Sequence, residues 1–276
     1  MSYVLTPSTI EQAVEMLTAH PGARPMSGGA SLVAMKNARL VEPDHVINLA
    51  GIAALRGFER QADGGLRIGG MVRHREVADA SILTGDQAMI RQAAGVIANR
   101  VVRNMGTLGG AVGNADPAAD YLPVLACADA QVELAGPDGL RHLAMHEYLV
   151  DWYETALQPG EFVAAVILPP TGQGPSVYRK LARTPGDYAT VSIACARVGQ
   201  SVRVAVGACG PAPLRARGAE AAISGRLTDP VAVADFGAAL AALADPIDDV
   251  RGSAEFRRRL IPRMVAAAIR DVTEAA

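Results

Sequence analysis

The sequence has few cysteines, and they are far apart. Three occur in 276 residues, at Cys127, Cys195 and Cys209, and none belongs to a C-x-x-C pair. A disulfide framework needs a dense, even set of cysteines, and a zinc or iron–sulfur site needs clustered thiolates. Because each cysteine lies in an apolar stretch, we interpret all three as buried, unreactive thiols. The chain itself is therefore not expected to hold an iron–sulfur cluster.

The chain also lacks an excess of charge and any long apolar run. Its 26 lysines and arginines face 28 aspartates and glutamates, which gives a net charge of −2. Without a basic field, binding to nucleic acid or to an anionic membrane is not expected. No stretch of about 18 uninterrupted apolar residues occurs, and the first residues, MSYVLTPSTIEQ, do not resemble a secretory signal. We therefore expect a soluble cytoplasmic protein without an integral membrane segment.

Half of the residues are apolar, which is enough for a substantial core in one large domain or two moderate ones. Strand-like and helix-like segments in both halves predict an α+β fold. The polar segment TGQGP, which starts at Thr171, is rich in glycine and proline and lacks periodicity. It predicts a boundary between an N-terminal domain of residues 1–170, with subdomains of about 1–56 and 57–170, and a C-terminal domain of residues 175–276.

Hydrophobic periodicity and end signals place the main elements. Ser8 and Glu11 fit a capping box at the start of a helix that ends at His20-Pro21-Gly22. A longer helix is expected from Gln87 to Ile97. In the C-terminal domain three antiparallel strands precede alanine-rich helices, the last spanning roughly Ala254 to Val272. Shorter predicted elements are strands at 3–5, 131–134 and 162–168, and a helix at 121–127.

Two glycine-paired loops are the strongest candidates for a ligand site. The first is Ser27-Gly28-Gly29-Ala30-Ser31 and the second is Thr107-Leu108-Gly109-Gly110. Glycine permits positive φ and lets a ligand approach where a Cβ atom would clash. Backbone amides that point outward at the start of a helix form an anion site. Each hydrogen bond to a charged group is worth roughly 1.5–3 kcal/mol, against about 0.3–1 kcal/mol for the helix dipole. The two loops together are therefore suited to both phosphates of a dinucleotide.

Neither loop is specific by itself. A Gly-Gly pair is often a tight turn without a ligand, and neither loop fits G-x-G-x-x-G or G-x-x-x-x-G-K-S/T. A Rossmann site or a P-loop is therefore not supported. The five histidines show no spacing typical of a metal site. No residue pattern demands a catalytic acid or base, so we name neither a catalytic residue nor a metal ligand.

The surroundings of the loops resemble a known family. RNMGTLGGAVGNADPAAD, which begins at Arg103, is similar to the signature of the FAD-binding medium subunits of the molybdenum hydroxylases, the family of xanthine dehydrogenase and carbon monoxide dehydrogenase. RPMSGGASL resembles the first FAD loop of that family, and YRKLARTPGDYATVSIA resembles the start of its C-terminal domain. The resemblance covers essentially the whole chain. It implies a two-part FAD-binding domain of the vanillyl-alcohol-oxidase and CO dehydrogenase flavoprotein type. A C-terminal domain with a three-stranded antiparallel sheet and a helical bundle would follow.

The resemblance implies an FAD site drawn from several segments. The two loops, residues 27–31 and 107–110, would bind the FAD diphosphate. Four further residues would lie at the cofactor: Asp120 in contact with FAD, Ile97 beside the flavin ring, Tyr188 near the isoalloxazine and Lys180 near the flavin.

Each of these four assignments has a plainer alternative. Asp120 would instead cap the helix that follows it, and Lys180 would be a solvated strand residue. Tyr188 and Ile97 would be ordinary core residues, although a core residue can also form the flavin wall.

One position departs from the family pattern. The second loop usually continues with asparagine, whereas this chain has Ala111. An amide contact near the diphosphate is therefore lost or supplied by another residue, for which Asn114 is the candidate. The backbone donors of the loop do not depend on this side chain, so FAD is still the expected cofactor.

The resemblance also implies a division of labour among three chains. A large subunit would carry a molybdopterin cofactor that oxidises the substrate, which would be an N-heterocycle, a purine, an aldehyde or carbon monoxide. A small iron–sulfur subunit would carry two [2Fe-2S] clusters, and electrons would pass from them through FAD on this chain to an external acceptor. We expect a dimer of heterotrimers. Two alternatives stay open: a stand-alone FAD-dependent oxidase or dehydrogenase with its own small substrate, and a scaffold that has lost the cofactor.

Overall fold

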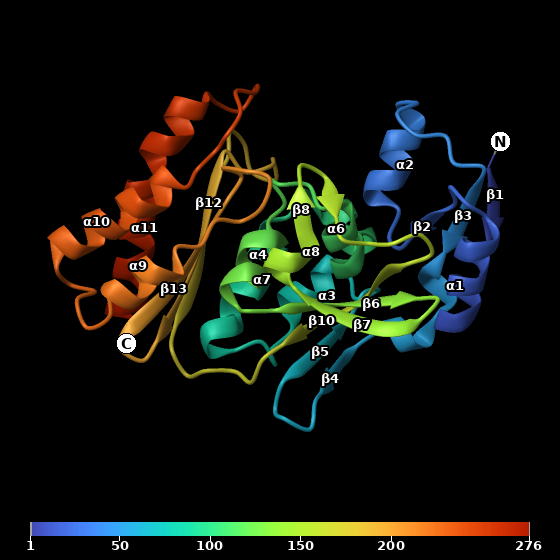
Figure 1. Cartoon of the computed structure of the whole chain (residues 1–276), viewed down its shortest axis with the longest axis horizontal. Helices are drawn as coiled ribbons and strands as arrows, with labels where there is room; N and C mark the ends of the chain where they lie inside the picture. The colour runs from blue at the N-terminus through green and yellow to red at the C-terminus, as the bar shows by residue number, and fades with distance from the viewer. Residues whose placement is uncertain (1, 276) are drawn as a thin grey trace.

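The computed structural model describes residues 2–275, which form three units in succession along the longest axis of the molecule (Figure 1). The N-terminal unit contains a small parallel sheet with strand order β1-β3-β2. Two helices join these strands, and the 3-10 helices η1 (Leu49–Gly51) and η2 (Ala53–Leu55) follow them. The elements of the sheet are β1 (Tyr3–Leu5), α1 (Ile10–Ala19), β2 (Arg24–Met26), α2 (Ala30–Asn37) and β3 (His45–Asn48).

The start of α1 differs from the sequence prediction by one residue. The N-cap is Thr9, whose side chain accepts a hydrogen bond from the Gln12 amide at 3.2 Å. Gln12 Oε1 in turn accepts from the Ser8 amide at 2.9 Å. The predicted capping box of Ser8 and Glu11 is therefore wrong. The extended backbone runs through Thr9, so Gln12 takes the third helical position that Glu11 was expected to occupy.

The second unit is built on a five-stranded antiparallel sheet with the order β4-β5-β10-β6-β7. Its central strand β10 (Phe162–Leu168) is apolar throughout, as predicted, because both of its faces are covered. Phe162 and Ala164 pack against the N-terminal unit, whereas Val163 and Val166 join the core under the helices of the second unit. The other strands of this sheet are β4 (Phe58–Arg60), β5 (Leu66–Gly69), β6 (Gln131–Gly136) and β7 (Gly139–Ala144).

Short helices cover one face of this sheet and carry the candidate site at their ends. α4 and α7 confirm the helices expected near residues 87–97 and at 121–127. A two-stranded hairpin, β8 (Leu149–Asp151) and β9 (Glu154–Thr155), projects beside them. The helical elements of the unit are α3 (His74–Asp79), η3 (Gly85–Gln87), α4 (Ala88–Val96), α5 (Arg100–Met105), α6 (Leu108–Asn114), α7 (Tyr121–Cys127) and α8 (Met145–Tyr148).

The third unit has a three-stranded antiparallel sheet, β11-β12-β13, between two layers of helices (Figure 1). Small side chains of β12, Ala194 and Ala196, face the core of the second unit, whereas Ile193 and Cys195 face the C-terminal helices. The three-stranded sheet and the helices behind it confirm the predicted architecture. The elements are β11 (Ser176–Leu181), β12 (Val191–Val198), β13 (Ser201–Gly207), α9 (Arg217–Ala222), α10 (Pro230–Ala242) and α11 (Ala254–Glu274).

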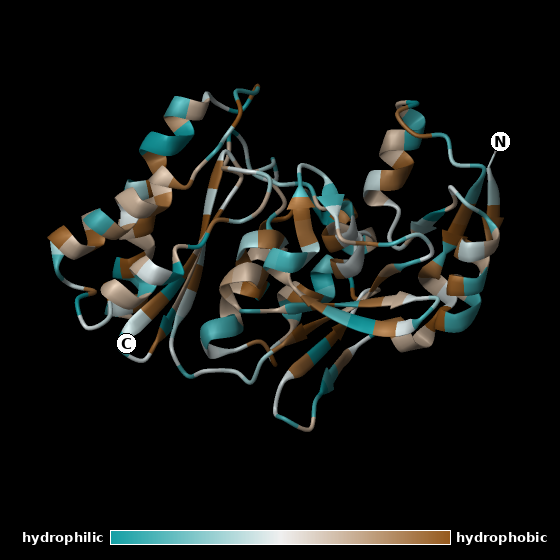
Figure 2. Ribbon diagram, in the orientation of Figure 1, coloured by the Kyte–Doolittle hydropathy of each residue, from teal (hydrophilic) through white to brown (hydrophobic). Residues whose placement is uncertain are grey.

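The distribution of apolar residues agrees with these layers. Figure 2 shows hydrophobic colour along the strands of the C-terminal sheet and a mixture of both colours on its outer helices. Cys127, Cys195 and Cys209 are free and buried, as predicted, and burial raises the pKa of the Cys127 and Cys209 thiols to about 12. Among residues 2–275, none of the helices combines the length and the apolar character that a membrane crossing requires.

Candidate functional site

The two glycine loops meet at one large cavity. Its volume is about 1110 Å³, above the roughly 300–1,000 Å³ of typical small-molecule pockets. Gly28 packs so closely on the residues just before the second loop that a Cβ atom there would overlap the Met105 carbonyl and lie 2.8 Å from Gly106 Cα. A Cβ on Gly110 would lie 3.0 Å from Thr107 Oγ1 and 3.5 Å from Ser27 Cβ. Segments about 80 residues apart therefore form one continuous wall.

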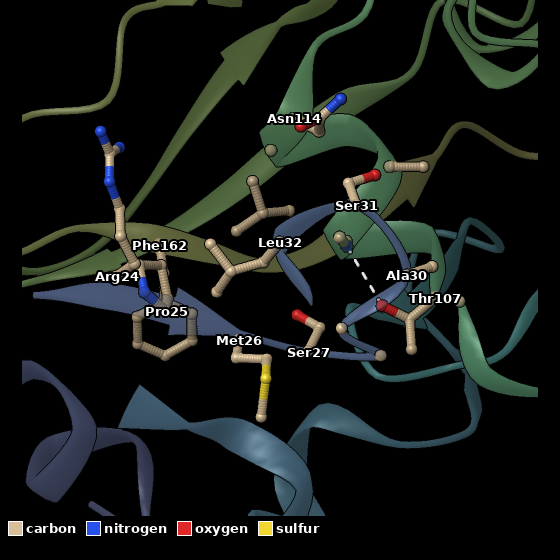
Figure 3. A pocket seen from close by; sticks show the side chains of 18 of the residues that line it. Arg24, Pro25, Met26, Ser27, Ala30, Ser31, Leu32, Thr107, Asn114 and Phe162 are labelled. Carbon is tan, nitrogen blue, oxygen red and sulfur yellow. Dashed lines mark hydrogen bonds between the residues drawn. The ribbon is translucent and has the colours of Figure 1, made fainter. Parts of the chain in front are cut away.

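The first loop presents free backbone donors to this cavity. Gly29, the N-cap of α2, has a φ of 72° and makes no side-chain cap. Among the described residues, the amides from Gly28 to Leu32 find no hydrogen-bond acceptor. The same residues line the cavity, and the Ser27 and Ser31 side chains lie beside them (Figure 3). A helix start with several unpaired amides is an anion site.

The second loop behaves differently from the prediction. Its amides are engaged within the protein: Leu108 donates to Val72 O at 2.9 Å, Gly109 to Gly70 O at 2.9 Å and Gly110 to Thr107 Oγ1 at 3.1 Å. For these three amides the expectation that they point at a ligand is therefore wrong. Gly109 serves close packing instead, because a Cβ there would lie 2.7 Å from Gly70 Cα.

The second loop contributes the Thr107 hydroxyl group and the backbone of its glycines to the cavity wall. Thr107 caps α6 by accepting from Gly110, and its own hydroxyl proton is still able to donate. The cavity is also lined by Gly110, Ala111 and Asn114. Figure 3 shows the Asn114 side chain on the same side of the cavity as Ser31. Leu108 is fully buried in the core of the second unit.

A neutral histidine lies behind the second loop. His74, the first residue of α3, is 4% exposed, and its Nδ1 is 3.2 Å from the Tyr121 hydroxyl. Burial, aided by the positive charge of Arg103, lowers its pKa to about 4. No local pattern indicates this residue, because its contacts with Tyr121 and with Gly106, just before the second loop, are tertiary.

Ile97 lines the cavity from the end of α4, and its backbone is firmly held. The Arg103 guanidinium donates to the carbonyl oxygens of Ile97 and Ala98 at 2.7 and 3.1 Å. Ala98 has a φ of 41°, and its carbonyl oxygen would lie 2.5 Å from a Cβ on Gly186. The turn after α4 is thus packed against the loop of the C-terminal domain that carries Tyr188.

Asp120 lines the cavity and is buried, yet it does not cap α7. Its Oδ1 accepts from the Tyr178 hydroxyl at 2.6 Å, and the Lys180 Nζ lies 2.9 Å from Oδ1 and 3.0 Å from Oδ2. The capping alternative for Asp120 is therefore wrong. The solvated alternative for Lys180 is also wrong, because its side chain is 9% exposed and paired. Of the described residues, those that line the cavity include Asp120 but neither Lys180 nor Tyr178.

Two tyrosines from different units line the cavity near Asp116. Tyr188 is 40% exposed, so it is not an ordinary core residue, and the Arg251 guanidinium lies 5.2 Å from its ring centre. Partial burial and the negative charge of Asp116 raise its pKa to about 12. Tyr153, at the tip of the β8–β9 hairpin, has a φ of 57°, which is unusual for a bulky residue. No pattern in the local sequence indicates that Tyr153 lines the cavity.

Two family models together match nearly the whole chain. The FAD-binding domain in molybdopterin dehydrogenase matches residues 1–171, and the CO dehydrogenase flavoprotein C-terminal domain matches residues 176–272. Both descriptions agree with the units seen in the structure, since the first match contains both glycine loops and the second contains the β11–β13 sheet.

Relatives match over nearly their full lengths. The carbon monoxide dehydrogenase medium chain of Afipia carboxidovorans is 35% identical, covering 95% of this chain and 93% of the relative. The glyceraldehyde dehydrogenase medium chain of Sulfolobus acidocaldarius is 29% identical, covering 98% of both. The crystal structure of a Cu,Mo-CO dehydrogenase in its cyanide-inactivated form superposes with a TM-score of 0.94 at 31% identity, covering 100% of this chain and 98% of that one. The chain therefore belongs to the FAD-binding medium subunits of the molybdenum hydroxylases, which are subunits of oxidoreductases.

Proposed function

We propose that this chain is the electron-transfer subunit of a heteromeric molybdenum-containing hydroxylase or dehydrogenase. Its partners would be an iron–sulfur small subunit with two [2Fe-2S] clusters and a molybdopterin large subunit, assembled as a dimer of heterotrimers in the cytoplasm. Bound FAD would accept electrons from the clusters and deliver them to an external acceptor, while the protein supplies binding and orientation. The organic substrate would be recognised by the large subunit.

One observation carries the proposal: both glycine loops line a single cavity. The residues present fit FAD in three respects. The cavity is larger than a typical small-molecule pocket. The first loop has unpaired amides for a diphosphate. Gly28 and Gly110 keep Cβ atoms out of the junction between the loops, where a phosphate would approach the backbone.

Within this site the roles divide by chemistry. Residues Ser27 to Ser31 would bind the diphosphate through backbone amides and hydroxyl groups, and Thr107 would add a donor from the opposite wall. Gly109 and Gly110 would form part of the cavity wall, and the buried side chain of Leu108 would anchor the loop in the core of the second unit. Ile97 and Tyr188 would border the flavin ring, since both line the cavity from segments that touch each other.

The direct test is FAD binding by a pair of glycine variants of the full chain. In Gly110→Ala the new methyl group enters the junction of the loops, 3.0 Å from Thr107 Oγ1. In Gly95→Ala, the matched control within helix α4, no atom of residues 2–275 apart from the adjoining residues and helix backbone lies within 4 Å of the new atom. We expect the dissociation constant of FAD to rise about tenfold or more in Gly110→Ala, because the methyl group would displace the Thr107 hydroxyl, whose charge-assisted hydrogen bond to the diphosphate would be worth roughly 1.5–3 kcal/mol. Equal affinities for both variants and the native chain would contradict the proposed site.

A second experiment separates the subunit from a stand-alone enzyme. The FAD-loaded chain would be mixed anaerobically with an aldehyde, a purine or an N-heterocycle, and the flavin absorption followed. We expect the flavin to stay oxidised with the chain alone and to be reduced only in the complex purified from the native source. Reduction of the isolated chain by one of these substrates would favour a stand-alone dehydrogenase. A chain that stays colourless after reconstitution with FAD would favour a scaffold without cofactor.

A further inference from the structure

Besides Tyr188, which lines the cavity directly, the C-terminal domain acts on the cavity through one buried carboxylate, that of Asp120. Asp120 belongs to the second unit, directly before α7, whereas its partners Tyr178 and Lys180 lie on strand β11 of the third unit. The two partners are two residues apart, so their side chains leave the same face of the strand. One face of β11 therefore supplies both a hydroxyl and an ammonium group to a single carboxylate at the cavity wall.

The Tyr178 hydroxyl is held in place and stays protonated. The residue is 9% exposed, and its backbone amide donates to Gln92 Oε1 at 2.8 Å, which holds the strand to α4. Burial and the negative charge of Asp120 raise the pKa of the phenol well above its usual range. The phenol is thus neutral and able to donate to Asp120 at any pH at which the protein is handled.

The negative charge of Asp120 depends on its two donors, Tyr178 and Lys180. Burial raises the pKa of Asp120, and the charge of Lys180 and the hydrogen bond from Tyr178 act in the opposite direction. A buried carboxylate without a donor takes up a proton instead of keeping its charge. Tyr178 and Lys180 of the C-terminal sheet therefore determine the charge and orientation of Asp120 at the cavity.

We propose that Tyr178, together with Lys180, is a positioning residue of the cofactor site that holds Asp120 as an oriented carboxylate at the cavity wall. The inference rests on the proposed function, because it takes the cavity to hold FAD. It changes the role expected of Lys180 from a direct flavin neighbour to a group that acts through Asp120. It also gives strand β11 of the C-terminal domain a part in the cofactor site, in addition to that of Tyr188.

The test is the pH dependence of FAD binding by full-length variants. The dissociation constant of FAD would be measured by absorption titration between about pH 4.5 and 8 for the native chain and Tyr178→Phe. Tyr148→Phe is the matched control, because it removes another buried hydroxyl, which donates to Val112 O at 3.3 Å and not to Asp120. We expect the acid inflection of the binding curve to move up by roughly one to two pH units in Tyr178→Phe, as loss of a hydrogen bond to a charged group implies. The control should keep the inflection of the native chain.

A double-mutant cycle tests whether Tyr178 acts through Asp120. In an Asp120→Asn background, Tyr178→Phe should change neither the affinity for FAD nor its pH dependence. If Tyr178→Phe does not fold, Lys180→Gln replaces it and should shift the inflection in the same direction. An inflection at the same pH in the native chain and in the folded variant, or none in either, overturns the inference while leaving the FAD site intact. Failure of the native chain to bind FAD would instead remove the proposed function itself.

Discussion

His74 gives a sharp prediction about stability, because a buried neutral histidine must take up a proton when the protein unfolds in acid. Its pKa is about 4 in the folded chain and 6.5 in ordinary surroundings. Between these values the unfolded chain binds more protons than the folded one, so the free energy of unfolding falls as the pH is lowered. With about 1.4 kcal/mol per pH unit, the loss from this group is about 2 kcal/mol between pH 7 and pH 5.

The assay is urea unfolding of the native chain and two variants at both pH values. His74→Gln keeps a polar side chain but does not titrate, so its loss of stability between pH 7 and pH 5 should be smaller than that of the native chain by about 2 kcal/mol. His146→Gln, at an exposed position on α8, is the control and should behave like the native chain. If the native chain and His74→Gln lose the same free energy, His74 is not buried in its neutral form and the reasoning is refuted.

Two further predictions concern the contacts between the second and third units. Gly186→Ala should lower the melting temperature and weaken FAD binding more than Gly199→Ala does. Both positions have positive φ, but only at Gly186 does the new Cβ meet a backbone carbonyl, at 2.5 Å; equal effects would show that the close contact is unimportant. Arg203→Met should cost roughly 3–5 kcal/mol in urea unfolding, because it leaves the Asp86 carboxylate, 8% exposed, without its 2.6 Å partner. Arg259→Met breaks a 3.8 Å pair on the surface and should cost under about 1 kcal/mol, and a similar loss for both would contradict the burial argument.

Local patterns were sufficient for much of the fold. The apolar run from Phe162 to Leu168 predicted β10, and the periodicity near the C-terminus predicted α11, because both signals come from neighbours in the sequence. The cap of α1 was misplaced by one residue, since both Ser8 and Thr9 have a suitable hydroxyl and the backbone geometry alone selects Thr9.

The site was predictable in its parts but not in its hydrogen bonding. Both loops were found from their glycines, and the first has the free amides that were expected. Two amides of the second loop, those of Leu108 and Gly109, are paired with the carbonyl oxygens of Val72 and Gly70, almost 40 residues earlier in the sequence, which no local pattern indicates. Likewise, Lys180 was identified from its surroundings in the sequence, but its pairing with Asp120 depends on how β11 packs against the residue directly before α7.

A crystal structure of the FAD-loaded full chain is the most direct test of the claim that the two loops bind one cofactor. We expect the diphosphate oxygens within about 3.2 Å of amides between Gly28 and Leu32, with the Thr107 hydroxyl facing them from the second loop. A diphosphate that contacts only one of the loops, or a cofactor bound outside the cavity between them, would contradict that claim.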